Sequence, residues 1–520
     1  MSTLLDQQSP LVLGLLKPEA YSHDCEEVEL IETHISWVFL TGRKAYKVKK
    51  PLDLGFLDFS SLEKRKRYCH EELRLNSRTA PDVYEEVVPI CGTPDKPLMD
   101  GKGEPFEYAV RMKQFPQDGL LDRQLQAGTL GLAKIEALAE KTAELHQEVS
   151  VSGPKDKFGT PESVAHWALE NFDQLQDKIR DRSRLTRLAW LGKWTEHWLS
   201  EHRELLMSRK MDGFVRECHG DLHLGNITEI DGQVVLFDGI EFNDEIRWID
   251  VINEMAFLFS DFQHREVQFL GWTALNRYLE ITGDYAGLSL FSFYRLYRLM
   301  VRAKIDSLRL AQPGLDDQER DELESEIDIY LRQAEQTVQE QKPTLVLMRG
   351  LSGSGKSYIS RGLLGQLRAI RLRSDIERKR LFQVAERASS DSELDQGIYS
   401  AEASHQTFSK LMELTSGILG AGYNTIVDAT FLKTELLEQF RSIAGEMDLA
   451  VKVLDLRASE QTLRERLRKR AEAGNEASEA DQKVLDSQLA GYQPLEGPGV
   501  VVVDGEDPPS AEQLAKTLLG

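Results

Sequence analysis

A short stretch near the middle of the chain combines residue types that can move a proton and hold a metal ion. Asp221 lies within the run 218–226, Asn226 follows it by five positions, and Asp238 closes an apolar run twelve residues later. An aspartate can orient and deprotonate an attacking hydroxyl group, and an asparagine with a second aspartate can hold Mg²⁺ against the phosphates of ATP. The residue types and their order therefore predict a phosphoryl-transfer site with Asp221 as catalytic base and with Asn226 and Asp238 as metal ligands.

A second stretch, residues 350–357, reads Gly-Leu-Ser-Gly-Ser-Gly-Lys-Ser and is a complete P-loop. It follows a buried-strand pattern at 344–348 and precedes a helical pattern at 358–367, the context in which a P-loop works. Backbone N–H groups and the lysine of such a loop contact phosphate oxygens, and its last serine binds Mg²⁺. The predicted nucleotide-binding residues are Gly350, Gly353, Ser354, Gly355, Lys356 and Ser357, with Ser357 also a metal ligand and Lys356 also acting on the transferred phosphate.

The elements that must position Asp221 begin with a predicted β-hairpin and a predicted helix, over residues 36–49 and 60–78. A strand lysine paired with a helix glutamate is the arrangement that holds the α- and β-phosphates of ATP. The candidates are Lys47 and Lys49, which share one face of the second strand, and Glu71 and Glu72 on the helix. The sequence leaves open which lysine and which glutamate pair; we choose both lysines and Glu71 as candidate nucleotide-site residues.

The run His219–Asn226, which reads His-Gly-Asp-Leu-His-Leu-Gly-Asn, resembles the aminoglycoside phosphotransferase-like branch of the protein-kinase-like fold. Members of that family have His-Gly-Asp at this place. The resemblance covers roughly residues 30–310 and implies a bilobal α+β domain with Asp221 as base and with Asn226 and Asp238 as Mg²⁺ ligands. It also implies that Asp250 stabilises the N-terminus of the next helix.

The chain departs from this family pattern at two places. Leu224 stands where many relatives have proline, and Asp238 is followed by Gly-Ile-Glu241 rather than by a Trp-Glu pair. Glu241 is either a further residue of the metal or substrate site or an ordinary charged residue after a strand. No Gly-rich loop precedes the lysines, and this absence favours small-molecule acceptors over protein acceptors.

Apolar runs in the C-terminal part end in acidic residues, as strands of a parallel α/β sheet do where ligands bind at their carboxyl ends. This part, roughly residues 343–520, resembles small P-loop kinases related to polynucleotide 5′-kinases, zeta-type toxins and gluconate kinase. The resemblance implies Asp375 as the base for the acceptor hydroxyl, Arg378 as a substrate-binding residue and Asp428 as an acid at the acceptor or metal site. It also implies that two residues of an arginine-rich helical segment close over the phosphates, namely Arg466 and Arg470.

The composition is that of a soluble globular protein with more than one domain, since 41% of its 520 residues are hydrophobic and 29% are charged. The formal net charge of −22 argues against general binding to nucleic acid or to anionic membranes, while a local nucleic-acid-end site in the C-terminal domain stays open. No apolar run is long enough to span a membrane. The four cysteines show neither metal-ligand spacing nor a disulfide framework, so we expect a cytoplasmic protein with reduced thiols.

The predicted chain has a protein-kinase-like α+β domain over residues 1–312, an acidic helical linker over 313–342 and a P-loop domain with a parallel α/β sheet over 343–520. We predict a bifunctional phosphotransferase that depends on ATP and Mg²⁺ and whose acceptors are hydroxyl groups of small molecules. Two alternatives stay open. One is a regulatory protein in which one domain binds ATP and gates the other; the second is a toxin-like or polynucleotide-end kinase in the C-terminal domain. Neither acceptor and no oligomeric state follows from the sequence.

Overall fold

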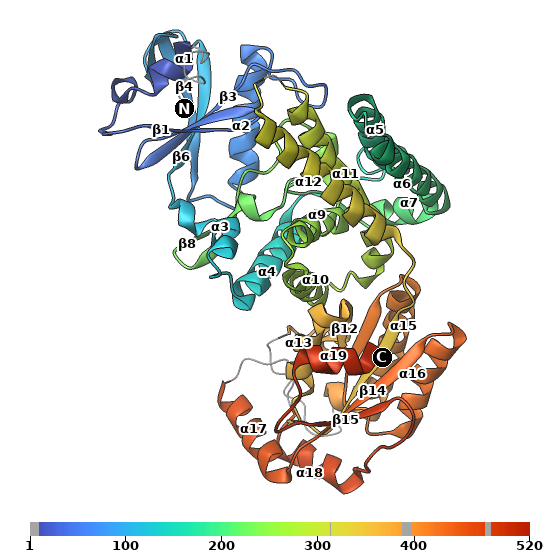
Figure 1. Cartoon of the computed structure of the whole chain (residues 1–520). Coiled ribbons are helices and arrows are strands. Elements are labelled where there is room, and N and C mark those ends of the chain that lie inside the picture. The colour runs from blue at the N-terminus through green and yellow to red at the C-terminus, as the bar shows by residue number, and fades with distance from the viewer. Residues whose placement is uncertain (1–9, 313, 387–396, 474–479, 520) are drawn as a thin grey trace. The chain divides into compact units, whose positions relative to one another are not determined.

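The computed structural model describes residues 10–312, 314–386, 397–473 and 480–519. The chain divides into two compact units (Figure 1). The first unit consists of residues 1–261 with 297–331, and the second consists of residues 262–296 with 332–520. Residue 313, where the predicted linker begins, lies outside the described residues, and the predicted domain boundaries stay a prediction.

The first unit begins with a six-stranded antiparallel sheet of strand order β1-β2-β3-β6-β4-β5. The predicted hairpin is present as β2 and β3, in which Trp37 lies opposite Val48. Helix α2 (Leu62–Asn76) packs on β4 and β6, and the hydroxyl oxygen of Ser61 caps it by accepting a hydrogen bond from the backbone N–H of Lys64. The strands are β1 (Glu29–Glu32), β2 (Ser36–Leu40), β3 (Lys44–Lys49), β4 (Tyr84–Thr93), β5 (Lys96–Met99) and β6 (Glu107–Lys113).

The remainder of the first unit is mainly helical, with two small two-stranded sheets, β7 with β10 and β8 with β9. Helix α9 carries the most apolar of these sequences and is buried on every side from Val251 to Ser260. The strands are β7 (Val215–Glu217), β8 (Ile227–Ile230), β9 (Gln233–Leu236) and β10 (Trp248–Asp250). The helices are α1 (Pro10–Leu15), α3 (Leu121–Gln126), α4 (Leu132–Glu148), α5 (Pro161–Lys178), α6 (Arg182–Glu201), α7 (Arg203–Met211) and α8 (Asp244–Arg247), with parts of α9 (Val251–His264), α11 (Leu288–Leu310) and α12 (Asp317–Val338).

The second unit is built on a five-stranded parallel sheet of order β12-β13-β11-β14-β15. The P-loop joins β11 to helix α13, and helix α10 (Gln268–Thr282) packs on α13 and β12. The strands are β11 (Thr344–Arg349), β12 (Ala369–Arg373), β13 (Asn424–Asp428), β14 (Ala450–Arg457) and β15 (Val500–Asp504). The other helices are α13 (Lys356–Leu367), α14 (Ser374–Leu381), α15 (Ala401–Gly420), α16 (Thr434–Glu446), α17 (Glu460–Ala473), α18 (Gln482–Gly491) and α19 (Ala511–Leu519).

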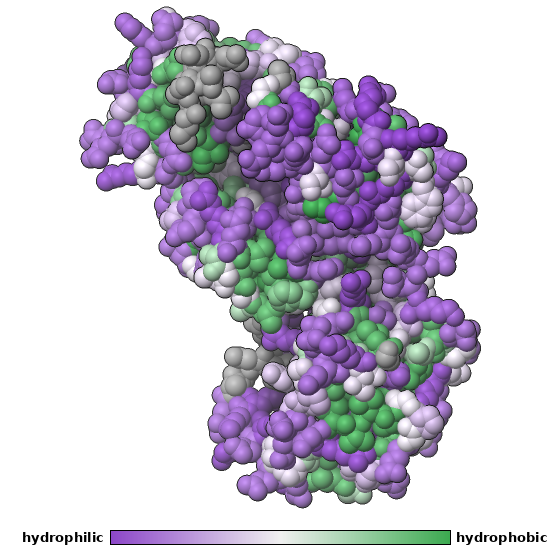
Figure 2. All heavy atoms as spheres, viewed as in Figure 1, coloured by the Kyte–Doolittle hydropathy of each residue, from purple (hydrophilic) through white to green (hydrophobic). Residues whose placement is uncertain are grey.

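The fold class predicted from the sequence is confirmed by these elements. The N-terminal part combines an antiparallel sheet with a helical part, and the C-terminal part has a parallel sheet that follows a P-loop. Figure 2 shows hydrophilic side chains over most of the visible face, with smaller hydrophobic patches among them. Among the described residues, no helix is both long enough and apolar enough to cross a bilayer.

Candidate active sites

The loop that carries Asp221 lies between β7 and β8 and ends in a 3₁₀ turn over Leu224–Asn226. The amide Nδ2 of Asn226 donates hydrogen bonds to the carbonyl oxygen and to Oδ2 of Asp221, at 3.0 and 3.1 Å. Gly220 has a φ of 87°, and a Cβ atom there would lie 3.3 Å from the carbonyl oxygen of Ile246. The loop therefore needs glycine before Asp221, and Asn226 fixes the carboxylate that follows.

The carboxylate of Asp221 is kept ionised by its neighbours. Its side chain is 38% exposed and its Oδ2 lies 3.5 Å from Nε2 of His223. Desolvation by itself would raise the pKa of Asp221, but His223 and Arg302 hold that pKa well below its usual range. Asp221 in turn raises the pKa of His223 against the effect of burial. An ionised and partly exposed carboxylate can accept a proton from a hydroxyl group.

The hairpin of β8 and β9 brings Asn226 and Asp238 to the same end of the first-unit site. Ile227 pairs with Leu236 at the end of the ladder, and just beyond this pair the backbone N–H of Phe237 donates a hydrogen bond to the carbonyl oxygen of Asn226 at 3.0 Å. Asp238 has a φ of 62°, and its backbone N–H donates to the hydroxyl oxygen of Tyr84 at 3.1 Å. The side-chain oxygens of Asn226 and Asp238 are hard donors of the kind that Mg²⁺ prefers, so these residues fit the predicted ion.

The lysine–glutamate pair left open by the sequence forms with Glu72. The Nζ atom of Lys47 lies 2.9 Å from Glu72 Oε1, and that of Lys49 lies 2.6 Å from Glu72 Oε2. Glu71 instead pairs with Arg74 at 2.9 Å. This corrects the choice of Glu71: the inward side of α2 at this height presents Glu72, whose side chain is fully buried, while Glu71 is 32% exposed.

The two lysines have different surroundings. Lys47 also pairs with Asp238, whose side chain is 37% exposed. Lys49 is fully buried, pairs with Glu241 as well as Glu72, and lies over the ring of Phe59. The structure thus gives Glu241 a contact with Lys49. Three carboxylates face two ammonium groups, and Asp238 is the most exposed of the three, so a cation could reach it there.

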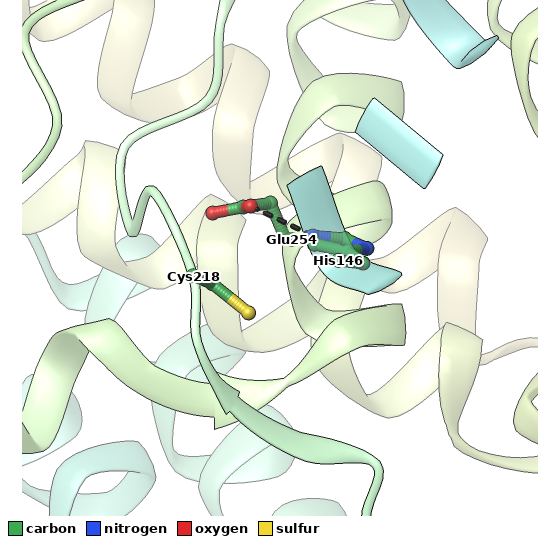
Figure 3. Close-up of side chains that lie close together, drawn as sticks. All are labelled: His146, Cys218 and Glu254. Atoms are coloured by element: carbon green, nitrogen blue, oxygen red, sulfur yellow. Dashed lines mark hydrogen bonds and ion pairs between the residues drawn. The ribbon is translucent and has the colours of Figure 1, made fainter. Parts of the chain in front are cut away.

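Behind the Asp221 loop lies a buried cluster that the sequence did not reveal (Figure 3). Glu254 of α9 accepts hydrogen bonds from the backbone N–H groups of His219 and Gly220, at 3.2 and 2.5 Å. Its Oε2 also lies 2.9 Å from Nε2 of His146 on α4. Burial opposes ionisation, but His146, His219 and the Gly220 N–H hold the pKa of Glu254 at about 2. No spacing or motif in the sequence marks His146, and the burial of Glu254 is not visible in its sequence context.

The third member of this cluster is Cys218, and its sulfur completes a group whose ligand atoms lie within 4.8 Å of one another. Such a group could hold a metal ion, but both oxygens of Glu254 already accept hydrogen bonds from the loop and from His146. The thiol of Cys218 donates to the carbonyl oxygen of Ile249 at 3.6 Å. The cluster therefore fixes the backbone just before Asp221.

Asp250 also occupies a structural position, as the family resemblance implied. Its Oδ1 accepts a hydrogen bond from the backbone N–H of Ile252 at 2.9 Å, in the first turn of α9. The guanidinium of Arg209 donates two hydrogen bonds to the same carboxylate, at 2.6 and 2.8 Å. Asp250 therefore caps α9, the helix that carries Glu254.

The second unit contains a cavity of about 1460 Å³ that begins at the P-loop. The Nζ atom of Lys356 donates to the carbonyl oxygens of Gly350 and Leu351, at 2.8 and 3.0 Å. Burial lowers the pKa of Lys356 to about 8, against the opposing effect of Asp428 and Asp375. The predicted site residues that line this cavity are Gly353, Gly355, Lys356, Ser357, Asp375, Arg378, Asp428, Arg466 and Arg470; Gly350 and Ser354 belong to the loop but not to the lining.

Two of the predicted arginines of the second unit donate hydrogen bonds to neutral oxygen atoms. Arg378 donates to the carbonyl oxygen of Ile398 at 2.8 Å and to Oγ of Ser404 at 3.3 Å. Arg466 donates to the carbonyl oxygens of Gly353 and Gly505, at 3.3 and 2.7 Å. Arg466 therefore reaches the backbone of the P-loop. Lining residues that the sequence did not single out include Arg373, Tyr399, His405, Phe431 and Gln439.

Sequence comparisons find similarity to known proteins over the C-terminal part and over most of the chain. A family model described as "AAA domain" matches residues 345–495. Three curated mycobacterial proteins, one from Mycobacterium bovis and two from Mycobacterium tuberculosis, are 29% identical to this chain over 454 residues. The match covers 87% of this chain and 88% of each relative, and all three are named as uncharacterized proteins.

Small-molecule kinases are found among the solved structures similar to each part of the chain. An ethanolamine kinase of Plasmodium vivax is 10% identical and covers 61% of this chain and 83% of its own, with a TM-score of 0.40. An amicoumacin kinase in complex with AMP-PNP, Ca²⁺ and Ami is 15% identical and covers 61% of this chain and 91% of its own, with a TM-score of 0.39. A sugar kinase of a Janibacter species is 24% identical and covers 34% and 92%, with a TM-score of 0.26.

Proposed function

We propose that this chain is a bifunctional ATP-dependent phosphotransferase with one transfer site in each unit. Each site would move the γ-phosphate of Mg·ATP to a hydroxyl group of a small molecule. The observation that carries the proposal is the convergence of Lys47, Glu72 and Asp238 with the Asp221–Asn226 pair, from four segments of the first unit. The P-loop cavity of the second unit supports a second site of the same reaction class.

In the first unit, Asp221 would accept the proton of the acceptor hydroxyl as its oxygen bonds to the γ-phosphorus and the bond from phosphorus to ADP breaks. Lys47 would contact the nucleotide phosphates, while Glu72 keeps its ammonium group in place. Asn226 and Asp238 would hold Mg²⁺, which offsets phosphate charge when bound. Glu254 would keep the Asp221 loop fixed during transfer.

In the second unit, Asp375 would act as base and Arg378 would bind the acceptor, since both line the cavity that begins at the P-loop. Lys356 would leave the carbonyl oxygens of Gly350 and Leu351 and move to the β- and γ-phosphates. Ser357 would bind Mg²⁺. Arg466 and Arg470 would close over the phosphates, with Asp428 at the acceptor or metal site.

The test is transfer of labelled γ-phosphate from ATP to metabolites of a cell extract. Asp221→Ala is expected to abolish one set of labelled products and Lys356→Ala the other, and the double variant is expected to label none. Products that survive in the double variant at the wild-type rate would show that the site assignments are wrong. ATP binding without transfer by either site would instead favour a regulatory protein.

The acceptors that we propose are small hydroxyl compounds. The net charge of −22 speaks against nucleic acid as a general partner. Each labelled product can be assigned to one site by its loss in one of the two single variants. Labelling of oligonucleotide ends that is lost in Lys356→Ala would identify the second unit as a polynucleotide-end kinase.

A further inference from the structure

Helix α10 lies outside the part of the chain that the family model matches, yet it belongs to the same compact unit as the P-loop. It packs on α13, the helix that follows the P-loop, and on β12 (Figure 1). The contact with α13 is close, because a Cβ atom on Gly365 would lie 2.6 Å from the Cβ of Phe269. Only glycine allows this approach.

The side chain of Asn276 on α10 binds the edge of the parallel sheet. Its Nδ2 donates to the carbonyl oxygen of Ala369 at 2.9 Å, and its Oδ1 accepts from the backbone N–H of Arg371 at 2.7 Å. Strand β12 is the last strand of the sheet on this side. Asn276 thus replaces part of a missing neighbour strand and fixes β12 against α10.

One turn further along α10, Glu280 places a buried carboxylate between two arginines of β12. Its Oε1 accepts hydrogen bonds from Nε and Nη2 of Arg371, at 3.1 and 2.8 Å. Its Oε2 lies 3.8 Å from Nη1 of Arg373, which lines the cavity. The side chain of Glu280 is only 3% exposed, so these contacts are shielded from water.

From Arg371 the contacts continue to the predicted phosphate site. Nη1 of Arg371 donates to the carbonyl oxygen of Ser357 at 3.4 Å and to Oγ of Ser360 at 3.3 Å. Oγ of Ser360 donates to Oδ2 of Asp428 at 3.2 Å. A carboxylate from outside the matched domain is therefore connected, through one guanidinium, to the residues predicted to bind Mg²⁺ and the acceptor.

We propose that Glu280 is a positioning residue of the P-loop site. It holds the guanidinium of Arg371 in the orientation that sets the first turn of α13, where Ser357 lies, and it fixes Arg373 at the cavity wall. The inference rests on the proposed function of the second unit. Without the carboxylate, Arg371 would be a buried cation free to turn away from Ser357, and the nucleotide phosphates would be bound less well.

The experiment uses the full chain carrying Lys47→Met and Asp221→Ala, so that the first unit loses both its base and its phosphate contact, and transfer and ATP binding are read at the P-loop. Glu280→Gln is expected to raise the KM for ATP and the calorimetric Kd for ATP roughly tenfold, with a smaller change in kcat. Glu438→Gln is the matched control, because Glu438 is 58% exposed and forms only a surface pair with Arg441 in the same unit. The control should leave KM, Kd and the melting temperature unchanged.

If Glu280 acts only in folding, Glu280→Gln will have a lower melting temperature and a smaller active fraction, but the folded protein will keep its KM and Kd for ATP. This result would overturn the inference. Should Glu280→Gln fail to fold, Arg371→Lys carries the test. It keeps a cation beside Glu280 but loses the fork that reaches Ser357 and Ser360, so the same rise in KM and Kd is expected and its absence would refute the proposal. If the Lys47→Met, Asp221→Ala parent binds no ATP, the proposed function of the P-loop site fails together with the inference.

Discussion

Replacing Lys49 should mainly destabilise the first unit, whereas replacing Lys47 should mainly slow transfer. Lys49 and Glu72 are fully buried and Glu241 is 3% exposed, so Lys49→Met leaves two carboxylates in the interior with one cation fewer. Breaking such a buried pair costs about 3–5 kcal/mol. The unfolding entropy is about 2.1 cal/mol/K per residue, so 1 kcal/mol shifts the melting temperature of a unit of this size by roughly 1.6 °C, and a drop of about 5–8 °C is expected.

Lys47→Met should slow first-unit transfer more than it lowers the stability of the unit. Its second partner, Asp238, is 37% exposed, so water or a cation can replace the lost ammonium group and the stability loss should be smaller. The lost phosphate contact should slow first-unit transfer roughly 10²-fold. Transfer is measured in a Lys356→Ala chain and unfolding by calorimetry. Lys64→Met is the control, since Lys64 is 45% exposed in a surface pair.

A rescue variant tests the charge argument directly. Adding Glu241→Gln to Lys49→Met removes the carboxylate that lost its ion pair with Lys49 and should recover about half of the lost stability, because the remaining Glu72 still has Lys47. An unchanged melting temperature in Lys49→Met would refute the reasoning. So would equal losses of rate and of stability in the two lysine variants.

Two further outcomes follow from the contacts behind each site. Glu254→Gln keeps the size of the side chain but turns an amide N–H₂ or a weaker acceptor toward the His219 and Gly220 N–H groups, so first-unit transfer should fall roughly 10–100-fold while P-loop transfer is unchanged. The control is Glu144→Gln, because the side chain of Glu144 is 59% exposed. Equal transfer rates in the two variants would count against the role of the cluster. Lys356, whose pKa burial lowers to about 8, is charged below that pH and neutral above it. ATP affinity at the P-loop should therefore decline above pH 8 and binding there should take up a proton, because bound phosphates favour the charged lysine. Calorimetry in buffers of different ionisation enthalpy measures the proton uptake. Binding that is independent of pH and takes up no proton would contradict this prediction.

Local pattern was sufficient to predict the P-loop, the hairpin that carries the lysines and the acids that end the parallel strands, because each depends on short-range spacing. Local pattern was not sufficient to choose between Glu71 and Glu72, because the two are neighbours in the sequence and only the rotation of α2 on the sheet decides which of them faces the lysines. The pattern of apolar residues in α2 does not determine the rotation of the helix to within one residue.

The residues that support each site escaped prediction for a related reason. Glu254 contacts a loop 34 residues earlier, and Glu280 contacts an arginine 91 residues later. A lone glutamate in a helical run looks like a solvated one until the fold buries it, and no spacing rule connects it with its partner. No spacing rule marks His146 either, although the residue is 2% exposed and its ring is hydrogen-bonded to Glu254.

The position of α10 also decides how the C-terminal activity can be isolated. A fragment of residues 343–520, cut at the boundary expected from the sequence, lacks Asn276 and Glu280, so the edge of β12 loses its backbone partner and Arg371 loses its carboxylate. Such a fragment should unfold at lower temperature and bind ATP more weakly than the full chain, because an open strand edge and an unpaired buried cation both destabilise it. An inactive fragment, or one without effect on cell growth, would therefore say little about the P-loop site in the intact protein. A fragment with the ATP affinity and thermal stability of the full chain would show that α10 is dispensable.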